Sequence, residues 1–161
     1  MDFNSVTNWF RGITSGKNFT LTVRNHYFPE IWYIVENFFS STSDKTVLDI
    51  GCGSGLISDA LGKSNWDVTC IDPVLECLLN TQKRFSNSKS EGRFEQADPE
   101  SLPFGDSAYE NILCINMLEL TESRGRTMKE LNRVLKPGGR AVIVTFAKTG
   151  FWARNSIAKN F

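Results

Sequence analysis

The stretch Val47–Gly55 (VLDIGCGSG) limits the possible folds of this chain more than any other part of the sequence. Residues Thr46–Ile50 are of strand type, and glycines follow at every second position through Gly51–Gly55. Apolar residues then recur at helical spacing over Leu56–Leu61. This pattern predicts a strand, a tight turn and a helix. Because glycine adopts positive φ at no steric cost and leaves the backbone bare, we expect a ligand on this turn.

The spacing of the glycines narrows the class of ligand. A dinucleotide-binding GxGxxG motif would need a glycine where the chain has Leu56. A phosphate-binding P-loop would need a lysine directly after the glycines, and Lys63 is too far along the chain. The turn itself has no cationic side chain, and Asp49 precedes it. These features favour a ligand that is neutral or positive at this end, such as an aminoacyl sulfonium.

Length and charge exclude several classes of protein. A chain of 161 residues is expected to form one domain. Its 18 bases and 18 acids give a net charge of zero, so neither nucleic acid nor an anionic membrane is indicated as a partner. No apolar run reaches the roughly 18 residues of a membrane span, and no signal sequence is recognisable at Met1, so a cytoplasmic protein is expected. Its four cysteines lack metal-site spacing, which favours reduced, mostly buried thiols with no disulfide and no metal.

Strand-type and helix-type segments alternate along the rest of the chain. Strands are expected at 67–71, 92–96, 109–115 and 140–146, and helices at 29–39, 56–63, 73–85, 124–136 and 151–161. The alternation predicts an α/β fold, a Rossmann-like doubly wound parallel sheet of order 3-2-1-4-5 with helices on both faces. We expect helix 29–39 near the middle of the sheet, and an apolar stripe on the helix after Pro73 formed by Leu75, Leu78, Leu79 and Phe85.

Acidic residues end the two strands that follow the glycine turn. Asp72 lies 17 residues after Gly55, where a crossover unit brings a side chain beside the first turn. Its carboxylate could accept hydrogen bonds from both hydroxyls of a ribose, and the alternative is that it only caps the next helix. Asp98 ends the third strand and is expected at the same crevice, with a solvated loop acid as the alternative.

A resemblance to a known family rests on four features: Asp49-x-Gly51-x-Gly53-x-Gly55, Asp72, Asp98 and LKPGG at Leu135–Gly139. Together they resemble the class I S-adenosylmethionine-dependent methyltransferases, in particular the small-molecule type 11 branch that includes quinone-biosynthesis C-methyltransferases. The resemblance covers roughly Asp44 to Lys148. It implies an N-terminal helical lid or cap segment over 1–43 and a methyltransferase core over 44–161 that is truncated at the C-terminus.

The resemblance also implies a cofactor and the residues that hold it. The cofactor would be S-adenosylmethionine, with S-adenosylhomocysteine as product and a small molecule as methyl acceptor. Asp49 would hold the methionine ammonium directly or through water, Asp72 the ribose hydroxyls and Asp98 the adenine amino group. The full set implied for the cofactor is Asp49, Gly51, Cys52, Gly53, Asp72, Pro73, Asp98, Pro99 and Asn116.

A catalytic base is harder to assign. Methyl transfer from a sulfonium is an in-line displacement that positioning accelerates, and a base is needed only if the acceptor must lose a proton. In many relatives a histidine follows the glutamate after strand four, but here Leu120 follows Glu119. The candidates are His26, Tyr27, Tyr33 and Glu119, although His26 at this position is more typical of an ordinary surface or capping residue.

The end of the chain suggests a second possible function. The family closes its sheet with two further strands that form an antiparallel edge, and this chain reaches Phe161 before both. We therefore expect these strands to be absent and strand 140–146 to present a bare apolar edge. Either the sequence is an N-terminal piece of a longer protein, or a second copy, a partner chain or the terminal helix covers this edge. A catalytically silent module that binds a partner protein through this edge is the alternative function. A nicotinamide-dependent reductase is disfavoured by the glycine spacing.

Overall fold

The computed structural model describes residues 28–146 and the backbone of residues 154–160. Its elements are, in chain order, α3 (Phe28–Phe39), β1 (Thr46–Ile50), α4 (Leu56–Lys63), β2 (Asp67–Asp72), α5 (Leu75–Ser88), β3 (Arg93–Gln96), β4 (Tyr109–Ile115), the 3₁₀ turn η2 (Leu118–Leu120), α6 (Arg124–Val134), β5 (Leu135–Phe146) and β6 (Arg154–Asn160).

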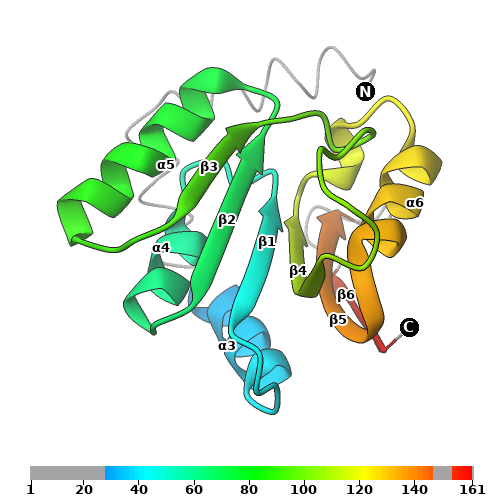
Figure 1. Ribbon diagram of the computed structural model, residues 1–161, viewed down its shortest axis with the longest axis horizontal. Coiled ribbons are helices and arrows are strands. Elements are labelled where there is room, and N and C mark those ends of the chain that lie inside the picture. Colours follow the sequence, from blue (N-terminus) through cyan, green and yellow to red (C-terminus); the bar gives the residue numbers. More distant parts are fainter. Residues whose placement is uncertain (1–27, 147–153, 161) are drawn as a thin grey trace.

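The strands form one sheet in the order β3-β2-β1-β4-β5-β6. The first five are parallel, which confirms the predicted order 3-2-1-4-5. Figure 1 shows β1, β2 and β3 rising toward the same edge of the sheet. Parallel strands deliver all their carboxyl ends to one edge, so the segments that follow β1, β2, β3 and β4 meet there.

Helices cover both faces of this sheet, as predicted. Successive residues of a strand point to opposite faces, and in β1 Val47 joins one buried cluster while Leu48 joins the other. The first cluster contains residues of α3, α4 and α5, and the second contains residues of α6 and of the β3–β4 loop. The predicted helix at 29–39 is therefore confirmed as α3, which buries Ile31, Val35 and Phe39 against the sheet.

The buried face of α5 differs from the predicted stripe. Leu78 and Phe85 are buried, but Leu75 and Leu79 are 51% and 53% exposed. The third buried position of the helix is Thr81 instead. The spacing Leu78, Thr81, Phe85 still follows one face of a helix, so the periodicity was right and the rotational phase was wrong by part of a turn.

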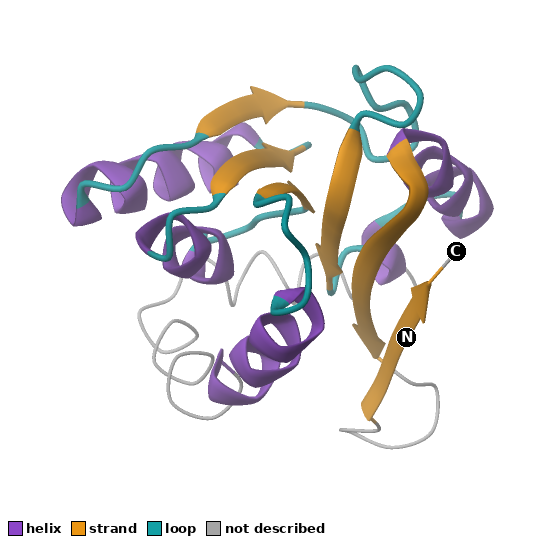
Figure 2. Ribbon diagram, turned by 60° about the horizontal axis from the view of Figure 1, so that its bottom comes forward, coloured by secondary structure: helices purple, strands orange, loops and turns teal. Residues whose placement is uncertain are grey.

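The C-terminal end of the described chain also differs from expectation. The sequence predicts a helix over 151–161 and no antiparallel edge, whereas residues 154–160 form strand β6, antiparallel to β5. Figure 2 shows the two strands side by side. Their register runs from Arg140 paired with Asn160 to Phe146 paired with Arg154. An unpaired strand edge would leave a row of backbone groups without partners. Strand β6 of the same chain supplies those partners at 140–146.

The LKPGG segment forms an irregular start of β5 rather than the end of a helix. α6 ends at Val134, two residues before the predicted end. Leu135 pairs with Tyr109 and Arg140 with Asn111, so several residues of β5 lie opposite a single residue of β4. Glycine is required at Gly139, since a Cβ there would lie 2.8 Å from the Glu110 carbonyl oxygen.

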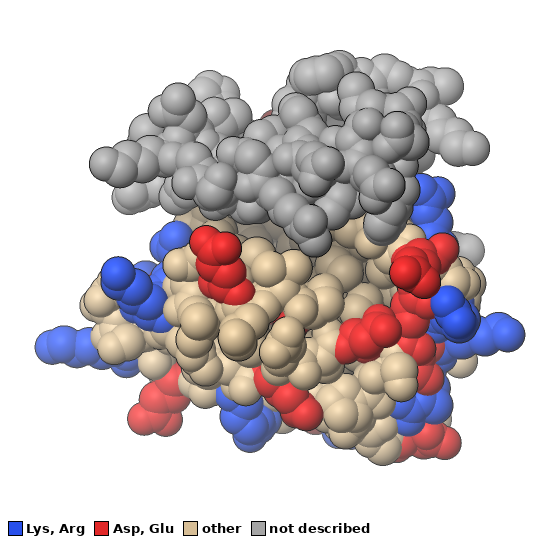
Figure 3. Space-filling model, turned by 90° about the horizontal axis from the view of Figure 1, so that it is seen from above, with Lys and Arg blue, Asp and Glu red and all other residues tan. Residues whose placement is uncertain are grey.

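Charged side chains of both signs lie on the face of the molecule drawn in Figure 3, where acidic and basic side chains are interspersed. Among the described residues, no helix has both the length and the apolar character needed to cross a bilayer. No group of three His, Cys, Asp or Glu in these same residues is placed to hold a metal ion. All four cysteines are free, and Cys70 and Cys114 are buried.

A buried asparagine ties β4 to the chain before β1. The Asn111 side chain is fully buried, and its Nδ2 donates to the carbonyl oxygens of Asp44 and Thr46 at 2.9 and 3.0 Å. Because these two acceptors would lose their partner, we expect Asn111→Ala to lower the free energy of unfolding by about 2 kcal/mol. Urea denaturation measures it, with exposed Asn87→Ala on α5 as control. Equal midpoints for the two variants would contradict this role.

Candidate cofactor site

The glycine turn lies between β1 and α4 at the carboxyl edge of the sheet. Gly51, Gly53 and Gly55 all have positive φ, at 77°, 57° and 69°. The amides of Gly51 and Cys52 both donate to the carbonyl oxygen of Ile71, at 2.9 and 3.0 Å, which fastens the turn to the end of β2. The turn is therefore the tight, glycine-dependent structure that the sequence predicts.

The three glycines have different surroundings. A Cβ on Gly51 would lie 2.6 Å from the Met117 sulfur, and a Cβ on Gly55 would lie 2.6 Å from Cγ2 of Thr81. At Gly53 the nearest heavy atom to such a Cβ is the Gly51 carbonyl oxygen, 3.9 Å away. Gly51 and Gly55 are thus required by close packing within the protein, whereas the backbone of Gly53 is bordered by open space.

Asp49 lies behind this turn. Its side chain is 4% exposed, and one carboxylate oxygen accepts a hydrogen bond from the Ser58 hydroxyl at the start of α4. Burial raises the pKa of the Asp49 carboxyl to about 6; the Ser58 hydrogen bond opposes this rise and the charge of Asp72 adds to it. A buried carboxylate beside the turn makes the local potential negative, which suits a cationic group nearby.

Asp72 connects the turn to the end of β2. One of its oxygens, Oδ2, accepts from the amide of Gly53 at 3.0 Å, and Oδ1 accepts from the amide of Val74 at 2.9 Å. The residue is 5% exposed. Burial raises the pKa of this carboxyl, and the hydrogen bonds from Val74 and Gly53 act in the opposite direction. Each oxygen keeps a further lone pair, so the carboxylate can still accept two more hydrogen bonds.

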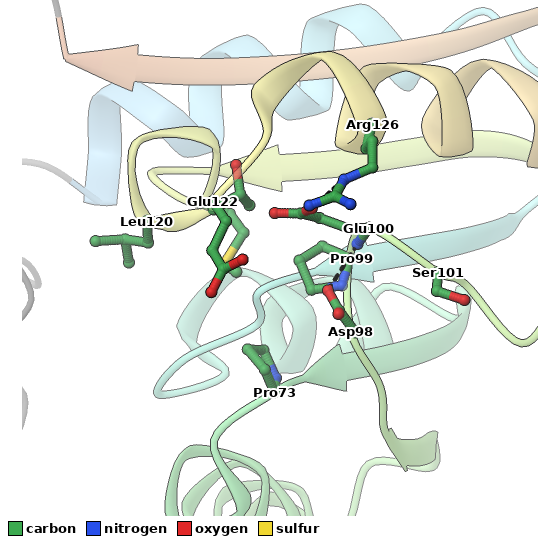
Figure 4. Close-up of a pocket in the computed structure, with 10 residues that line it drawn as sticks. Pro73, Asp98, Pro99, Glu100, Ser101, Leu120, Glu122 and Arg126 are labelled. Atoms are coloured by element: carbon green, nitrogen blue, oxygen red, sulfur yellow. Dashed lines mark hydrogen bonds and ion pairs between the residues drawn. The ribbon is translucent and has the colours of Figure 1, made fainter. Parts of the chain in front are cut away.

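A cavity of about 390 Å³ lies beside the turn, at the ends of β2, β3 and β4. Its lining residues are Pro73, Asp98, Pro99, Glu100, Ser101, Met117, Leu120, Thr121, Glu122 and Arg126. Figure 4 shows Pro73, Pro99 and Glu122 around the same hollow. Asp98 is exposed, and its Oδ1 accepts from the Glu100 amide at 2.8 Å, an arrangement that shapes the loop after β3.

The loop on one side of the cavity is fastened to α6. Glu100 accepts from the Ser123 amide at 2.7 Å and pairs with Arg126 at 2.8 Å, and this pair is drawn in Figure 4. Ser123 is the N-cap residue of α6, so the carboxylate also lies at the positive end of the helix dipole. The ion pair and the helix end therefore keep the cavity wall in place.

The segment after β4 closes the site from the other side. Asn116 has a φ of 53°, and its amide donates to the Val144 carbonyl oxygen at 2.7 Å. The next residue, Met117, contacts Gly51 and also lines the cavity, so it joins the turn to the cavity. Glu119 accepts from the Thr145 hydroxyl at 2.8 Å.

The structure thus brings together two groups of predicted site residues. Asp49, Gly51, Cys52, Gly53 and Asp72 form the turn and its support, and Pro73, Asp98 and Pro99 line the cavity. Asn116 follows β4 beside Met117.

The candidate bases are placed less fully. His26 and Tyr27 lie outside the described residues. Tyr33 is 68% exposed on α3 and is not among the cavity residues. Glu119 lies in η2, directly after the site.

Several residues at the site were not predicted. Ser58, Thr81, Arg84 and Glu122 contact the turn residues or line the cavity. Only Thr81 could have been found from the sequence, because it lies at helical spacing between Leu78 and Phe85, where an apolar residue is expected. Contacts of Thr81 and Arg84 with the turn span 28 and 30 residues of sequence, and no local pattern reports them.

Residues 48–143, more than half of the chain, match the family model described as a methyltransferase domain. The chain belongs to this family. The match confirms the resemblance to class I S-adenosylmethionine-dependent methyltransferases, and S-adenosylmethionine is the cofactor of that class.

Individual relatives agree with the family assignment. Ubiquinone biosynthesis O-methyltransferase of Rickettsia bellii is 30% identical over 121 residues, which are 73% of this chain and 50% of the relative. The enzyme of the same name from Xylella fastidiosa is 33% identical over 110 residues, or 68% and 45%. This methyltransferase-family chain therefore spans about half the length of the curated relatives it matches.

Solved structures show the same fold. An S-adenosylmethionine-dependent methyltransferase of Methanosarcina mazei superposes with a TM-score of 0.64 at 30% identity, covering 72% of this chain and 58% of that one. The YcgJ protein of Bacillus subtilis superposes with a TM-score of 0.67 at 25% identity, covering 72% and 50%. The likeness extends over most of the described part of this methyltransferase-family chain.

The raised pKa of Asp49 predicts a pH-dependent stability difference. The folded carboxyl, with a pKa of about 6, keeps its proton where the unfolded one, with an ordinary value of 3.8, has lost it, so stability falls as pH rises from about 4 to 6. Asn keeps an acceptor for Ser58 and carries no charge. We expect Asp49→Asn to raise the free energy of unfolding above pH 6 by up to about 3 kcal/mol.

Urea denaturation from pH 4 to pH 8 measures this difference, which should shrink toward zero at pH 4. The control is Asp67→Asn at the exposed start of β2, for which no comparable gain is expected. A wild-type protein that remains the more stable at pH 8 would contradict the buried, destabilising charge.

Proposed function

We propose that this methyltransferase-family chain binds S-adenosylmethionine across its glycine turn and cavity and transfers the methyl group to a small-molecule acceptor. The observation that carries the proposal is the Gly53 backbone, which is bordered by open space and hydrogen-bonded to the Asp72 carboxylate. Bare backbone beside a carboxylate with spare lone pairs fits a ribose and the chain attached to it.

Named residues would hold each part of this cofactor. The two spare lone pairs of Asp72 suit the two hydroxyls of a ribose. Asp98, Pro73 and Pro99 line the cavity beside it and suit the adenine ring and its amino group. Asp49 is buried behind the turn, which favours an indirect role, through water or through its field, toward the methionine ammonium. Gly51, Cys52 and Asn116 would contribute backbone groups.

The chemistry needs few reactive groups from the protein. When bound, S-adenosylmethionine supplies a methyl group on a cationic sulfur, which departs as a neutral thioether when an acceptor attacks in line. The residues of the chain then have to hold and orient the reactants and to limit access of water. The rigid turn, fastened at Ile71 and at Asp72, suits this task.

We propose an oxygen atom as the methyl acceptor, since the relatives from Rickettsia bellii and Xylella fastidiosa carry the name O-methyltransferase. A hydroxyl acceptor must lose its proton during transfer. His26, Tyr27 and Glu119 remain the candidates for accepting that proton. The lid proposed for residues 1–43 would bring His26 and Tyr27, whereas α3, within the same range, packs against the sheet.

The two alternatives are less well supported. The silent module was proposed because a bare edge was expected at 140–146, and β6 covers that edge. Pairing of a second copy or a partner chain with the same edge of β5 is opposed by the same observation, since β6 already occupies that edge. The nicotinamide-dependent reductase is opposed by the glycine spacing, and calorimetric titration with NAD would test it directly.

Replacement of Asp72 tests the ribose assignment. Because Asp72→Ala removes the acceptor for the ribose hydroxyls, we expect the Kd for S-adenosylmethionine and for S-adenosylhomocysteine to rise about tenfold or more. Isothermal titration calorimetry measures both constants. Asp67→Ala, at the other end of β2, is the matched control and should leave them unchanged. Equal affinities in Asp72→Ala and wild type would remove the assignment.

Replacement of Gly53 tests whether the cofactor lies on the turn. Gly53→Ala and Gly138→Ala both place a Cβ in open space at positive φ, and each should lower stability by about 1 kcal/mol. Only Gly53→Ala should weaken cofactor binding, because its methyl group would occupy the space against the backbone. A Kd that changes equally in both variants, measured by the same calorimetry, would place the cofactor elsewhere.

A further inference from the structure

The helix α5 carries a polar residue where it passes the glycine turn. Thr81 is fully buried, on the same face of the helix as the apolar residues Leu78 and Phe85. A buried hydroxyl is unfavourable unless it is hydrogen-bonded. The partner of this hydroxyl is therefore informative about why a threonine occupies the position.

The Thr81 hydroxyl bonds to the turn itself. Its Oγ1 donates to the carbonyl oxygen of Gly53 at 2.9 Å and accepts from the Cys52 thiol at 3.7 Å. The γ-methyl group of Thr81 fills the space against Gly55. One side chain thus contacts three successive parts of the turn.

A second residue of α5 acts one helical turn further along. The Nε of Arg84 donates to the carbonyl oxygen of Ser54 at 2.7 Å. Thr81 and Arg84 are three residues apart, so both face the same direction. Consecutive carbonyl groups of the turn, at Gly53 and Ser54, are therefore both held from α5.

The Gly53 residue is consequently held on two sides. Its amide donates to Asp72 at the end of β2, and its carbonyl oxygen accepts from Thr81. With both groups engaged, rotation about the backbone of Gly53 would break at least one hydrogen bond. Glycine is otherwise the residue with the greatest backbone freedom, so this turn needs such restraint to keep one conformation.

We propose that Thr81 and Arg84 are positioning residues, which hold the Gly53 and Ser54 carbonyl groups from α5 so that the turn is preformed for the cofactor. The inference rests on the proposed function, because it requires the cofactor to lie on this turn. Neither residue needs to touch the cofactor. Preformation of a site raises affinity because less conformational freedom is lost on binding.

Substitutions at Thr81 test the inference. Thr81→Val keeps the shape and removes the hydroxyl, and we expect the Kd for S-adenosylhomocysteine to rise roughly tenfold in calorimetry. Thr81→Ser keeps the hydroxyl and should retain an affinity close to that of the wild type. Thr127→Val on α6 is the matched control, because Thr127 is equally buried and its hydroxyl bonds to the Ser123 carbonyl oxygen, outside the turn.

Comparing Thr81→Val with Thr127→Val separates an effect on the conformation of the turn from a general loss of stability. Thr81→Val and Thr127→Val should both lower the melting temperature, but only Thr81→Val should change the affinity. If the affinity of Thr81→Val equals that of Thr127→Val, or if Thr81→Ser loses as much as Thr81→Val, the inference is overturned.

Arg84 provides a second test, because it is only partly buried and its removal leaves the core intact. Arg84→Met should weaken binding several-fold, and the exposed neighbour Lys83→Met should not. An unchanged affinity in Arg84→Met would remove Arg84 from the proposal. Asp72→Ala, measured in parallel, distinguishes the two levels: no loss there overturns the cofactor placement, whereas a loss there without one in Thr81→Val overturns only the positioning role.

Discussion

The peptide backbone at Gly53 is the constraint on which the site depends, and its two hydrogen-bonding groups engage different elements. Its amide bonds to Asp72 of β2, and its carbonyl bonds to Thr81 of α5. This requires β2 to lie beside β1 and α5 to pass below the turn. Both conditions are met, because β1 and β2 pair in parallel and α5 packs against α4 and β2. The conformation of the three glycines in the turn therefore depends on the order of the strands in the sheet.

The glycines of the turn divide into two kinds. Gly51 and Gly55 allow Met117 and Thr81 to approach the backbone closely, and they would be required even in a protein with no ligand. Gly53 has no such neighbour, so open space beside it is available to a bound molecule. A motif of alternating glycines therefore combines residues needed for packing with one suited to recognition. The sequence alone does not distinguish the glycines needed for packing from the glycine that faces open space.

The sequence predicted the features that depend on local pattern. Apolar runs that alternate with helical segments indicated the five parallel strands, and the glycines with Asp72 indicated the edge at which the site lies. It failed at residues 154–160, where strand pairing with β5 outweighed a weak helical pattern, and at Leu75 and Leu79, where apolar residues remain exposed. Thr81 was missed because its partner lies 28 residues earlier, a contact that only the folded chain creates.

The protonated state of Asp49 has a consequence for the heat of ligand uptake. Near pH 6 about half of the molecules carry a proton on this buried carboxyl, and a cation that settles beside it favours the ionised form. Uptake of such a cation then expels a proton into the buffer. The apparent enthalpy of binding would therefore vary with the ionisation enthalpy of the buffer. In this way Asp49, buried behind the turn, would couple binding of the cation to release of a proton into the solvent.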